Sequence, residues 1–206
     1  MLYGVSGASG VGKSTVCELV ADALDIAFIK TSITESARKH GYDAVGDLSL
    51  PERIDLQEKL LNDHVEMLEQ AERPAILDRT PIDMIGYMMG EVYMNSHEKL
   101  TREQMFRISS FATKCMWVVK RHYDSIFHLA PLPFYEQSQT RPAENPAYQK
   151  HTDFIMRGAL AEMQGQISNA ILNTTDLNER QEFIHNTIVQ RLDHLEALRK
   201  SHPNIH

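Results

Sequence analysis

The stretch GASGVGKST, residues 7–15, is made of residue types that bind phosphate. Its glycines let the backbone turn so that successive N–H groups point at phosphate oxygens, and the positive end of a following helix adds to the attraction. Lys13 can reach the terminal phosphates, and the Ser14 hydroxyl is a ligand for Mg²⁺. We therefore expect ATP with Mg²⁺ to bind to the whole stretch, which consists of Gly7, Ala8, Ser9, Gly10, Val11, Gly12, Lys13, Ser14 and Thr15.

A second group of polar residues follows the apolar run 75–77, where Asp78 and Arg79 stand next to each other. The carboxyl ends of the strands line the ligand crevice of an open α/β sheet, so both side chains should face the bound phosphates. Asp78 would then hold Mg²⁺ together with Ser14, directly or through water. In the alternative interpretation Asp78 caps the next helix and Arg79 is a surface charge.

Apolar patterning predicts the elements that must position these residues. Short apolar runs predict five strands, within residues 1–6, 26–32, 74–78, 125–131 and 169–175. Apolar residues at helical spacing predict helices over 13–24, 33–41, 50–72, 81–94 and 101–123, then from about 147, and finally over 176–198. Strands that alternate with helices imply a parallel sheet covered on both faces. The stretch GASGVGKST thus follows a strand and opens a helix, which is the context that its motif G-x-x-x-x-G-K-[ST] requires.

The two motifs GASGVGKST and ILDRTPID together resemble the nucleoside and nucleotide kinase branch of the P-loop superfamily. That branch includes thymidylate kinases and the phage or bacterial AAA-type kinase-like ATPases. The resemblance implies an α/β three-layer sandwich with a five-stranded parallel sheet and a lid segment, and an Arg79 that grips the phosphate of an acceptor. Similar proteins carry an acid and an arginine facing the acceptor at the place of Glu35 and Arg38. An ordinary exposed pair at (i, i+3) is an equally good interpretation of these two residues.

The segment from 132 to 148 is longer than most connections and is rich in proline, glutamine and charged residues. It resembles the lid of these kinases, which we place at about 134–148, and Arg141 is the arginine that would cover the transferring phosphoryl group. A plain flexible loop is the alternative. Trp117, in the helix before it, is expected in the core rather than in a base-stacking platform.

Composition limits the classes of protein. The 206 residues are 42% hydrophobic, which is enough for one core, so we expect a single domain over 1–198 with a frayed tail over 199–206. No apolar run approaches a membrane span and no signal-peptide pattern is present, so we expect a soluble, cytoplasmic protein without a membrane partner. The net charge of −7 argues mildly against long nucleic acids as ligands. The only two cysteines, Cys17 and Cys115, are expected to be reduced and buried.

The sequence favours an ATP-dependent kinase whose catalytic residues are Lys13, Glu35, Asp78, Arg79 and Arg141, and whose acceptor is bound by Glu35, Arg38 and Arg79. We expect a nucleotide or nucleoside-like small molecule as the acceptor, with a nucleoside monophosphate favoured. The sequence leaves open whether two copies of the chain form a homodimer.

Two alternatives remain for the function. A kinase acting on a hydroxymethylated pyrimidine in phage DNA would need a basic groove, to which eight residues could contribute: Lys30, Arg38, Lys39, Lys120, Arg121, Arg141, Lys150 and Arg157. The other alternative, a nucleotide-dependent ATPase switch, would consume ATP without an acceptor.

Overall fold

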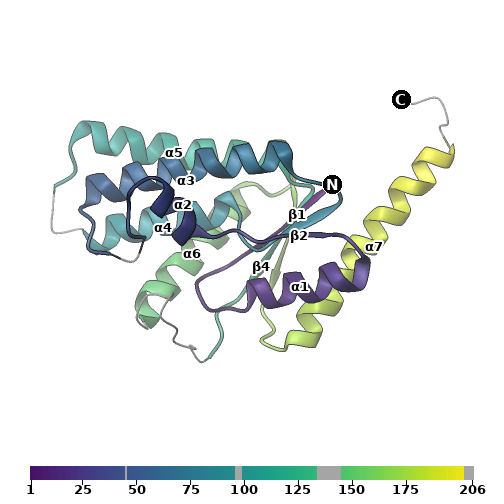
Figure 1. Ribbon diagram of the computed structural model, residues 1–206. Coiled ribbons are helices and arrows are strands. Elements are labelled where there is room, and N and C mark those ends of the chain that lie inside the picture. The colour runs from purple at the N-terminus through teal and green to yellow at the C-terminus, as the bar shows by residue number, and fades with distance from the viewer. Residues whose placement is uncertain (45, 96–98, 134–144, 202–206) are drawn as a thin grey trace.

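The computed structural model describes residues 1–44, 46–95, 99–133 and 145–201. They form a five-stranded sheet of order β2–β3–β1–β4–β5, in which every neighbouring pair is parallel (Figure 1). The strands are β1 (Leu2–Ser6), β2 (Ala27–Ile29), β3 (Ala75–Leu77), β4 (Ser125–Leu129) and β5 (Ser168–Leu172). Because all five run in the same direction, their carboxyl ends meet at one edge of the sheet, where the loops that follow can converge.

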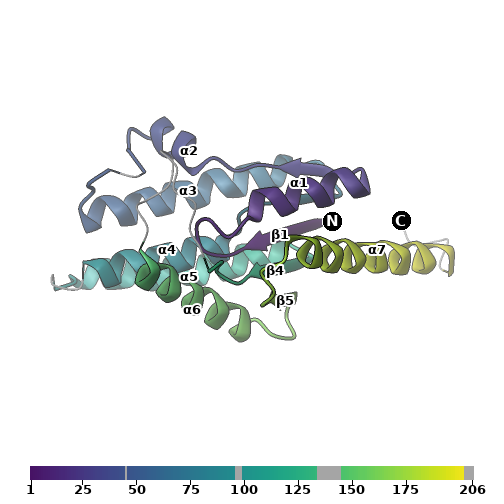
Figure 2. The same ribbon diagram turned by 90° about the horizontal axis from the view of Figure 1, so that it is seen from below.

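Helices cover both faces of this sheet (Figures 1 and 2). One face carries α1 (Lys13–Leu24) and α7 (Leu177–Ser201). The other face carries α3 (Leu50–Gln70), α4 (Pro81–Met94), α5 (Arg102–His122) and α6 (Pro146–Glu162), and the short α2 (Ile33–Lys39) follows β2. Alternate residues of β1 accordingly enter different cores, with Leu2 on the α3–α6 side and Tyr3 and Val5 on the α1–α7 side. The predicted three-layer α/β sandwich is confirmed.

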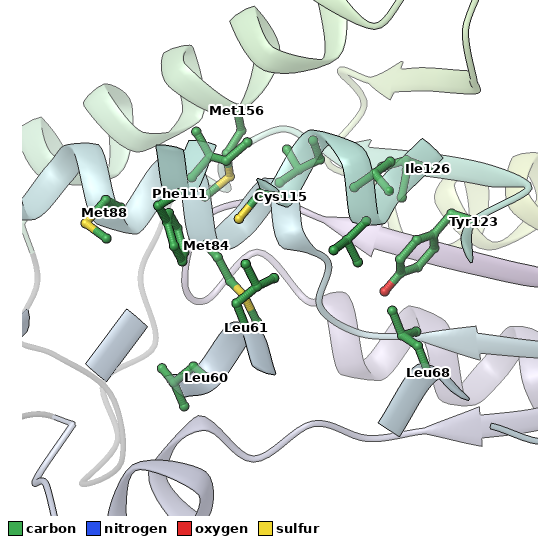
Figure 3. Close-up of a cluster of buried hydrophobic side chains, with 14 of the residues drawn as sticks. Leu60, Leu61, Leu68, Met84, Met88, Phe111, Cys115, Tyr123, Ile126 and Met156 are labelled. Atoms are coloured by element: carbon green, nitrogen blue, oxygen red, sulfur yellow. The ribbon is translucent and has the colours of Figure 1, made fainter. Parts of the chain in front are cut away.

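The larger core fixes helices α3 to α6 against β4 (Figure 3). Its side chains are almost completely buried and come from every helix on that face: Leu60, Leu61 and Leu68 of α3, Met84 and Met88 of α4, Phe111 and Cys115 of α5, and Met156 of α6, with Tyr123 and Ile126 beside them. Close packing of this kind leaves the helices little freedom to shift. The helix faces that project beyond the edge of the sheet are therefore held in fixed positions.

Most predicted elements agree with the structure, and α4 has the predicted bounds. Helix α7 continues to Ser201, three residues into the segment that we expected to fray. The prediction for Trp117 is wrong, because its side chain is 56% exposed. The buried stripe of α5 includes Phe111 and Cys115, and a residue two positions after Cys115 lies on the opposite side of the helix. Both cysteines are buried and free, as expected.

Candidate active site

A cleft of about 800 Å³ opens at the carboxyl ends of β1, β2 and β3. Residues 9–15 after β1, residues 30–35 after β2 and residues 78–80 after β3 line it, and the walls are formed by α3, α4 and the start of α6. The fold thus brings residues 9–15 of the phosphate-binding stretch into one cavity with four residues that are distant in sequence: Glu35, Arg38, Asp78 and Arg79. A concave site at this edge of a parallel sheet is where ligands of such folds bind.

The loop between β1 and α1 requires glycine at two positions. Gly7 has φ of +148°, and a Cβ there would lie 2.8 Å from the backbone oxygen of Leu129, so the loop passes close to the end of β4. Gly12 has φ of +87° and is the N-cap of α1, where a Cβ would meet no atom within 4 Å. Gly12 is therefore required by its backbone conformation rather than by crowding. The first N–H groups of α1 have no partner within the helix and are available to an anion at the cleft.

Lys13 points back into this loop. Its Nζ donates to the backbone oxygens of Gly7 at 2.6 Å and Ala8 at 2.9 Å, and it lies 3.7 Å from the Asp83 carboxylate. Burial lowers the pKa of Lys13 to about 8, although the nearby Asp83 acts in the opposite direction. The ammonium group is therefore held within the phosphate-binding loop, but at a cost in desolvation.

Asp78 connects the end of β3 to the first turn of α1 and to the loop after β2. Its carboxylate accepts hydrogen bonds from Ser14 Oγ at 2.6 Å and from the N–H and Oγ1 of Thr31, both at 3.0 Å. The alternative that Asp78 caps the next helix is wrong, because Thr80 is the N-cap of α4. In the described part of the chain, no group of three His, Cys, Asp or Glu side chains could hold a metal by itself. The oxygens of Ser14 and Asp78 nevertheless fit Mg²⁺, which binds through one or two protein ligands together with substrate phosphates.

Asp83 was not predicted as a site residue, although it occupies the centre of the site. It is 1% exposed, and its Oδ1 accepts from the Gly7 N–H at 3.0 Å. Its Oδ2 accepts from the N–H and Oγ1 of Thr80, both at 2.8 Å, and this completes the capping box of α4. The pattern Thr80-x-x-Asp83 is a signal for that cap in the sequence. The contact with Gly7 has no comparable signal.

Arg79, which follows β3, and the pair Glu35 and Arg38 on α2 all line the cleft. The half-buried Arg79 places its guanidinium 5.9 Å from the centre of the Tyr87 ring on α4. Although burial acts to lower the pKa of Arg79, the neighbouring Tyr87, Asp83 and Asp78 outweigh it and raise the pKa, so the arginine is charged. Glu35 and Arg38 are exposed at the cleft rim on α2, where the Glu35 N–H donates to the capping Ser32. Arg141 lies outside the described residues.

Arg180 of α7 is a further residue that was missed. It is 2% exposed, and its guanidinium donates to three backbone oxygens, those of Val11 at 2.7 Å, Ala130 at 2.8 Å and Thr174 at 2.8 Å. One side chain thereby joins the phosphate-binding loop to the loops that follow β4 and β5. Neither a motif nor a spacing in the sequence indicates this connection.

The cleft ends in a second polar group, made of Arg53 on α3, Glu91 on α4 and Tyr148 on α6. Arg53 Nε lies 3.5 Å from Glu91 Oε2, and the Tyr148 hydroxyl donates to Glu91 Oε1 at 3.3 Å. Burial, with the neighbouring Glu91, raises the pKa of Tyr148, so the phenol is protonated and acts as a donor. We did not predict this group, because its members come from three helices that are distant in sequence.

Residues 3–180 match the family model AAA_28, which is described as an AAA domain. The chain belongs to this family. Two solved structures share the fold of this AAA-family domain. Deoxyadenosine kinase from M. mycoides with bound dCTP matches 92% of this chain and 100% of its own length, with a TM-score of 0.67 and 16% identity. The NadR protein in complex with NAD and AMP-PNP matches 90% of this chain, with a TM-score of 0.62 and 16% identity.

The AAA-family domain covers 48% of the NadR chain and so corresponds to about half of that protein. The comparison with curated proteins gave no match. The two structural likenesses establish the fold, and together with the family they confirm the predicted membership of the P-loop nucleoside and nucleotide kinase-like superfamily. Among the described residues, no helix has the length and apolar character needed to cross a membrane.

Proposed function

We propose that this chain is a kinase that transfers the γ-phosphoryl group of ATP to a hydroxyl group of a nucleoside. The carboxylates of the cleft carry the proposal. Asp78, Asp83 and Glu91 all accept hydrogen bonds from neighbouring groups. In the part of the chain that the structure describes, the Glu35 carboxylate has no such partner, and it lies at the cleft rim. An uncommitted carboxylate is suited to accept the proton of an attacking hydroxyl group, whereas it would repel an acceptor phosphate.

The structural neighbours support a nucleoside or nucleotide ligand. The deoxyadenosine kinase has been solved with bound dCTP and with bound dATP, and the NadR protein with AMP-PNP. ATP would bind to residues 7–15 of this chain, where the glycine-rich backbone, the N-terminus of α1 and Lys13 together attract phosphate. Ser14 and Asp78 would hold Mg²⁺, which neutralises phosphate charge when it is bound.

Glu35 and Arg79 would have separate roles in phosphoryl transfer. The acceptor oxygen forms a bond to the γ-phosphorus while the bond from that phosphorus to the bridging oxygen of ADP breaks, and Glu35 takes the proton of the hydroxyl group. Arg79, which is charged and close to the phosphate-binding loop, would neutralise charge on the transferring group. The lid at about 134–148 and the role of Arg141 stay predictions.

A nucleoside monophosphate acceptor is the second candidate, because Arg38 and Arg79 both line the cleft and could bind an acceptor phosphate. Two variants separate the candidates. For a nucleoside acceptor, Glu35→Gln should lower kcat by about 100-fold or more, since the proton acceptor is lost. For a monophosphate acceptor, Glu35→Gln should be mild and Arg79→Ala should chiefly raise the KM of the acceptor.

Steady-state kinetics with a nucleoside and with its monophosphate measure both effects. Glu18→Gln is the matched control, because Glu18 is exposed on α1 outside the cleft. Wild-type rates for both Glu35→Gln and Arg79→Ala would place the acceptor elsewhere.

The basic residues that a DNA acceptor would require do not form one groove in the described part of the chain. Lys30 and Arg38 line the cleft. Lys120 and Arg121 end α5 just before β4, and so lie at the opposite edge of the sheet. Arg157 binds Asp153, and Lys39 binds Asp63. This arrangement favours a small acceptor over DNA.

A further inference from the structure

A row of buried polar side chains connects the end of β1 to α6. The Oγ of Ser6, the last residue of β1, lies 3.3 Å from Nδ1 of His128 on β4. On the other side of the ring, His128 Nε2 lies 2.9 Å from Asp153 Oδ1 on α6. All three residues are completely buried. We call Ser6, His128 and Asp153 the buried triad.

The same residue types form the nucleophilic triad of many hydrolases. That role needs a serine that a substrate can reach, whereas Ser6 is buried and does not line the cleft. Burial acts to raise the pKa of Asp153, but the hydrogen bonds from His128 and Arg157 outweigh it and lower the pKa. The ionised carboxylate accepts from His128 Nε2–H, and in a neutral ring Nδ1 then accepts from the Ser6 hydroxyl. The buried triad is therefore a connection between elements rather than a nucleophile.

The connection reaches the start of the phosphate-binding loop, because Ser6 directly precedes Gly7. A second contact joins the same helix to the same loop. Gln149, four residues before Asp153 on α6, donates from Nε2 to the backbone oxygen of Ser9 at 3.2 Å. Residues four positions apart lie on the same face of a helix. One face of α6 therefore holds the loop both before Gly7 and at Ser9.

Helix α6 is itself held in place. Its Met156 and Leu160 are fully buried in the larger core. A Cβ added to Gly86 of α4 would lie 2.5 Å from the Met156 side chain, so the two helices approach each other closely. Close packing of this kind resists a shift of one helix against the other. The position of α6 is thus fixed independently of the loop that it contacts.

We infer that His128 is a positioning residue for ATP, because it transmits the fixed position of α6 through Ser6 to the phosphate-binding loop. A loop whose N–H groups are already aimed at the phosphate oxygens needs no ordering when the ligand binds. Without the triad the loop has more freedom, and ATP should bind more weakly. The inference rests on the ATP site of the proposed function but not on the transfer of the phosphoryl group.

Calorimetric titration of the full chain with Mg²⁺ and AMP-PNP tests the inference. Ser6→Ala removes the hydroxyl group from the triad and should weaken binding by about 5- to 30-fold, as expected for the loss of one buried hydrogen bond. Tyr123→Phe is the matched control, because it removes a hydroxyl group from another buried histidine, His64 at 2.8 Å, at the opposite edge of the sheet. It should bind AMP-PNP within about 2-fold of wild type. Urea denaturation of both variants separates a general loss of stability from a loss of ATP affinity.

Two variants of His128 test the connection to α6. His128→Gln can place its amide near the position of Nε2 and keep the bond to Asp153, but it loses the bond to Ser6. His128→Asn can place its amide near the position of Nδ1 and keep the bond to Ser6, but it loses the bond to Asp153. Because each retains only half of the triad, both should bind AMP-PNP at least about 5-fold more weakly than wild type.

Ser6→Ala changes only a small side chain, so it is decisive even if a histidine variant fails to fold. Wild-type affinity in Ser6→Ala or in His128→Asn would overturn the inference, and so would an equal loss of affinity in Tyr123→Phe. No binding of AMP-PNP to wild type would contradict both the inference and the proposed function. Binding that depends on the triad, without phosphorylation of any nucleoside, would contradict the proposed reaction and leave the inference standing.

Discussion

The two carboxylate oxygens of Asp83 hold two different elements of the site. One oxygen holds the Gly7 N–H at the start of the phosphate-binding loop, and the other caps helix α4 through Thr80. Lys13 lies 3.7 Å away, so the buried carboxylate also has a cation beside it. A movement of α4 would therefore shift the phosphate-binding loop, because the Asp83 carboxylate is bonded to both.

The burial of Lys13 predicts that the free energy of unfolding depends on pH. Burial lowers its pKa to about 8 from the ordinary value of 10.5. Between these two pH values the unfolded chain binds the proton and the folded chain has lost it, so the free energy of unfolding rises with pH in this window. Below pH 8 both states hold the proton, and the full cost of burying the charge is present.

We expect the stability of wild type relative to Lys13→Met to increase by up to about 3 kcal/mol from pH 7 to 10.5. Urea denaturation at a series of pH values measures it. Lys120→Met, at an exposed position of α5, is the control and should show no such trend. A difference between wild type and Lys13→Met that is constant with pH would contradict the assignment of a buried, charged lysine.

The loops at the edge of the sheet are connected to one another by side chains rather than by the strands alone. Thr31 joins the loop after β2 to Asp78 at the end of β3. Arg180 joins the loops after β1, β4 and β5 from the first turn of α7. The phosphate-binding loop is thus held from both sides, and its shape depends on helices that do not contact the phosphates themselves.

Arg180→Met should lower the free energy of unfolding by about 2–4 kcal/mol, because three backbone oxygens lose a charged donor. It should also weaken ATP binding, since Val11 belongs to the phosphate-binding loop. Arg180→Lys should restore only part of both, because an ammonium group cannot reproduce the planar fork of donors. Denaturation and ATP titration measure the two effects.

The control for this prediction is Arg191→Met, at an exposed position of the same helix. If Arg180→Met unfolded at the same denaturant concentration as Arg191→Met and bound ATP as wild type does, the connection through Arg180 would be unimportant.

Local patterns were sufficient to predict individual elements. Pro81 at the start of α4 and the apolar periodicity of α3 gave helices that the structure confirms. Trp117 was placed wrongly because a large aromatic side chain was assumed to be buried, whereas its position on α5 faces away from the core. Its ring is instead covered by Arg121, whose guanidinium lies 5.2 Å from the ring centre.

For the molecule as a whole, the sequence predicted the phosphate end of the cleft better than its far end. Residues 7–15 form a local motif, so their chemistry can be read without the fold. Arg53, Glu91 and Tyr148 come together only because α3, α4 and α6 pack on the same face of the sheet around a common core (Figure 3). Such groups carry no local signal and depend on how distant helices pack.

The central claim is that the whole cleft serves transfer of a phosphoryl group from ATP to a nucleoside, and product analysis tests it most directly. The full chain is incubated with ATP, Mg²⁺ and one nucleoside at a time, and all nucleotides are quantified. We predict ADP and a nucleoside monophosphate in equal amounts, formed only when a nucleoside is present and lost in Lys13→Ala, which should remain folded. ATP hydrolysis that proceeds equally without a nucleoside, or product formation that Lys13→Ala retains, would contradict the account.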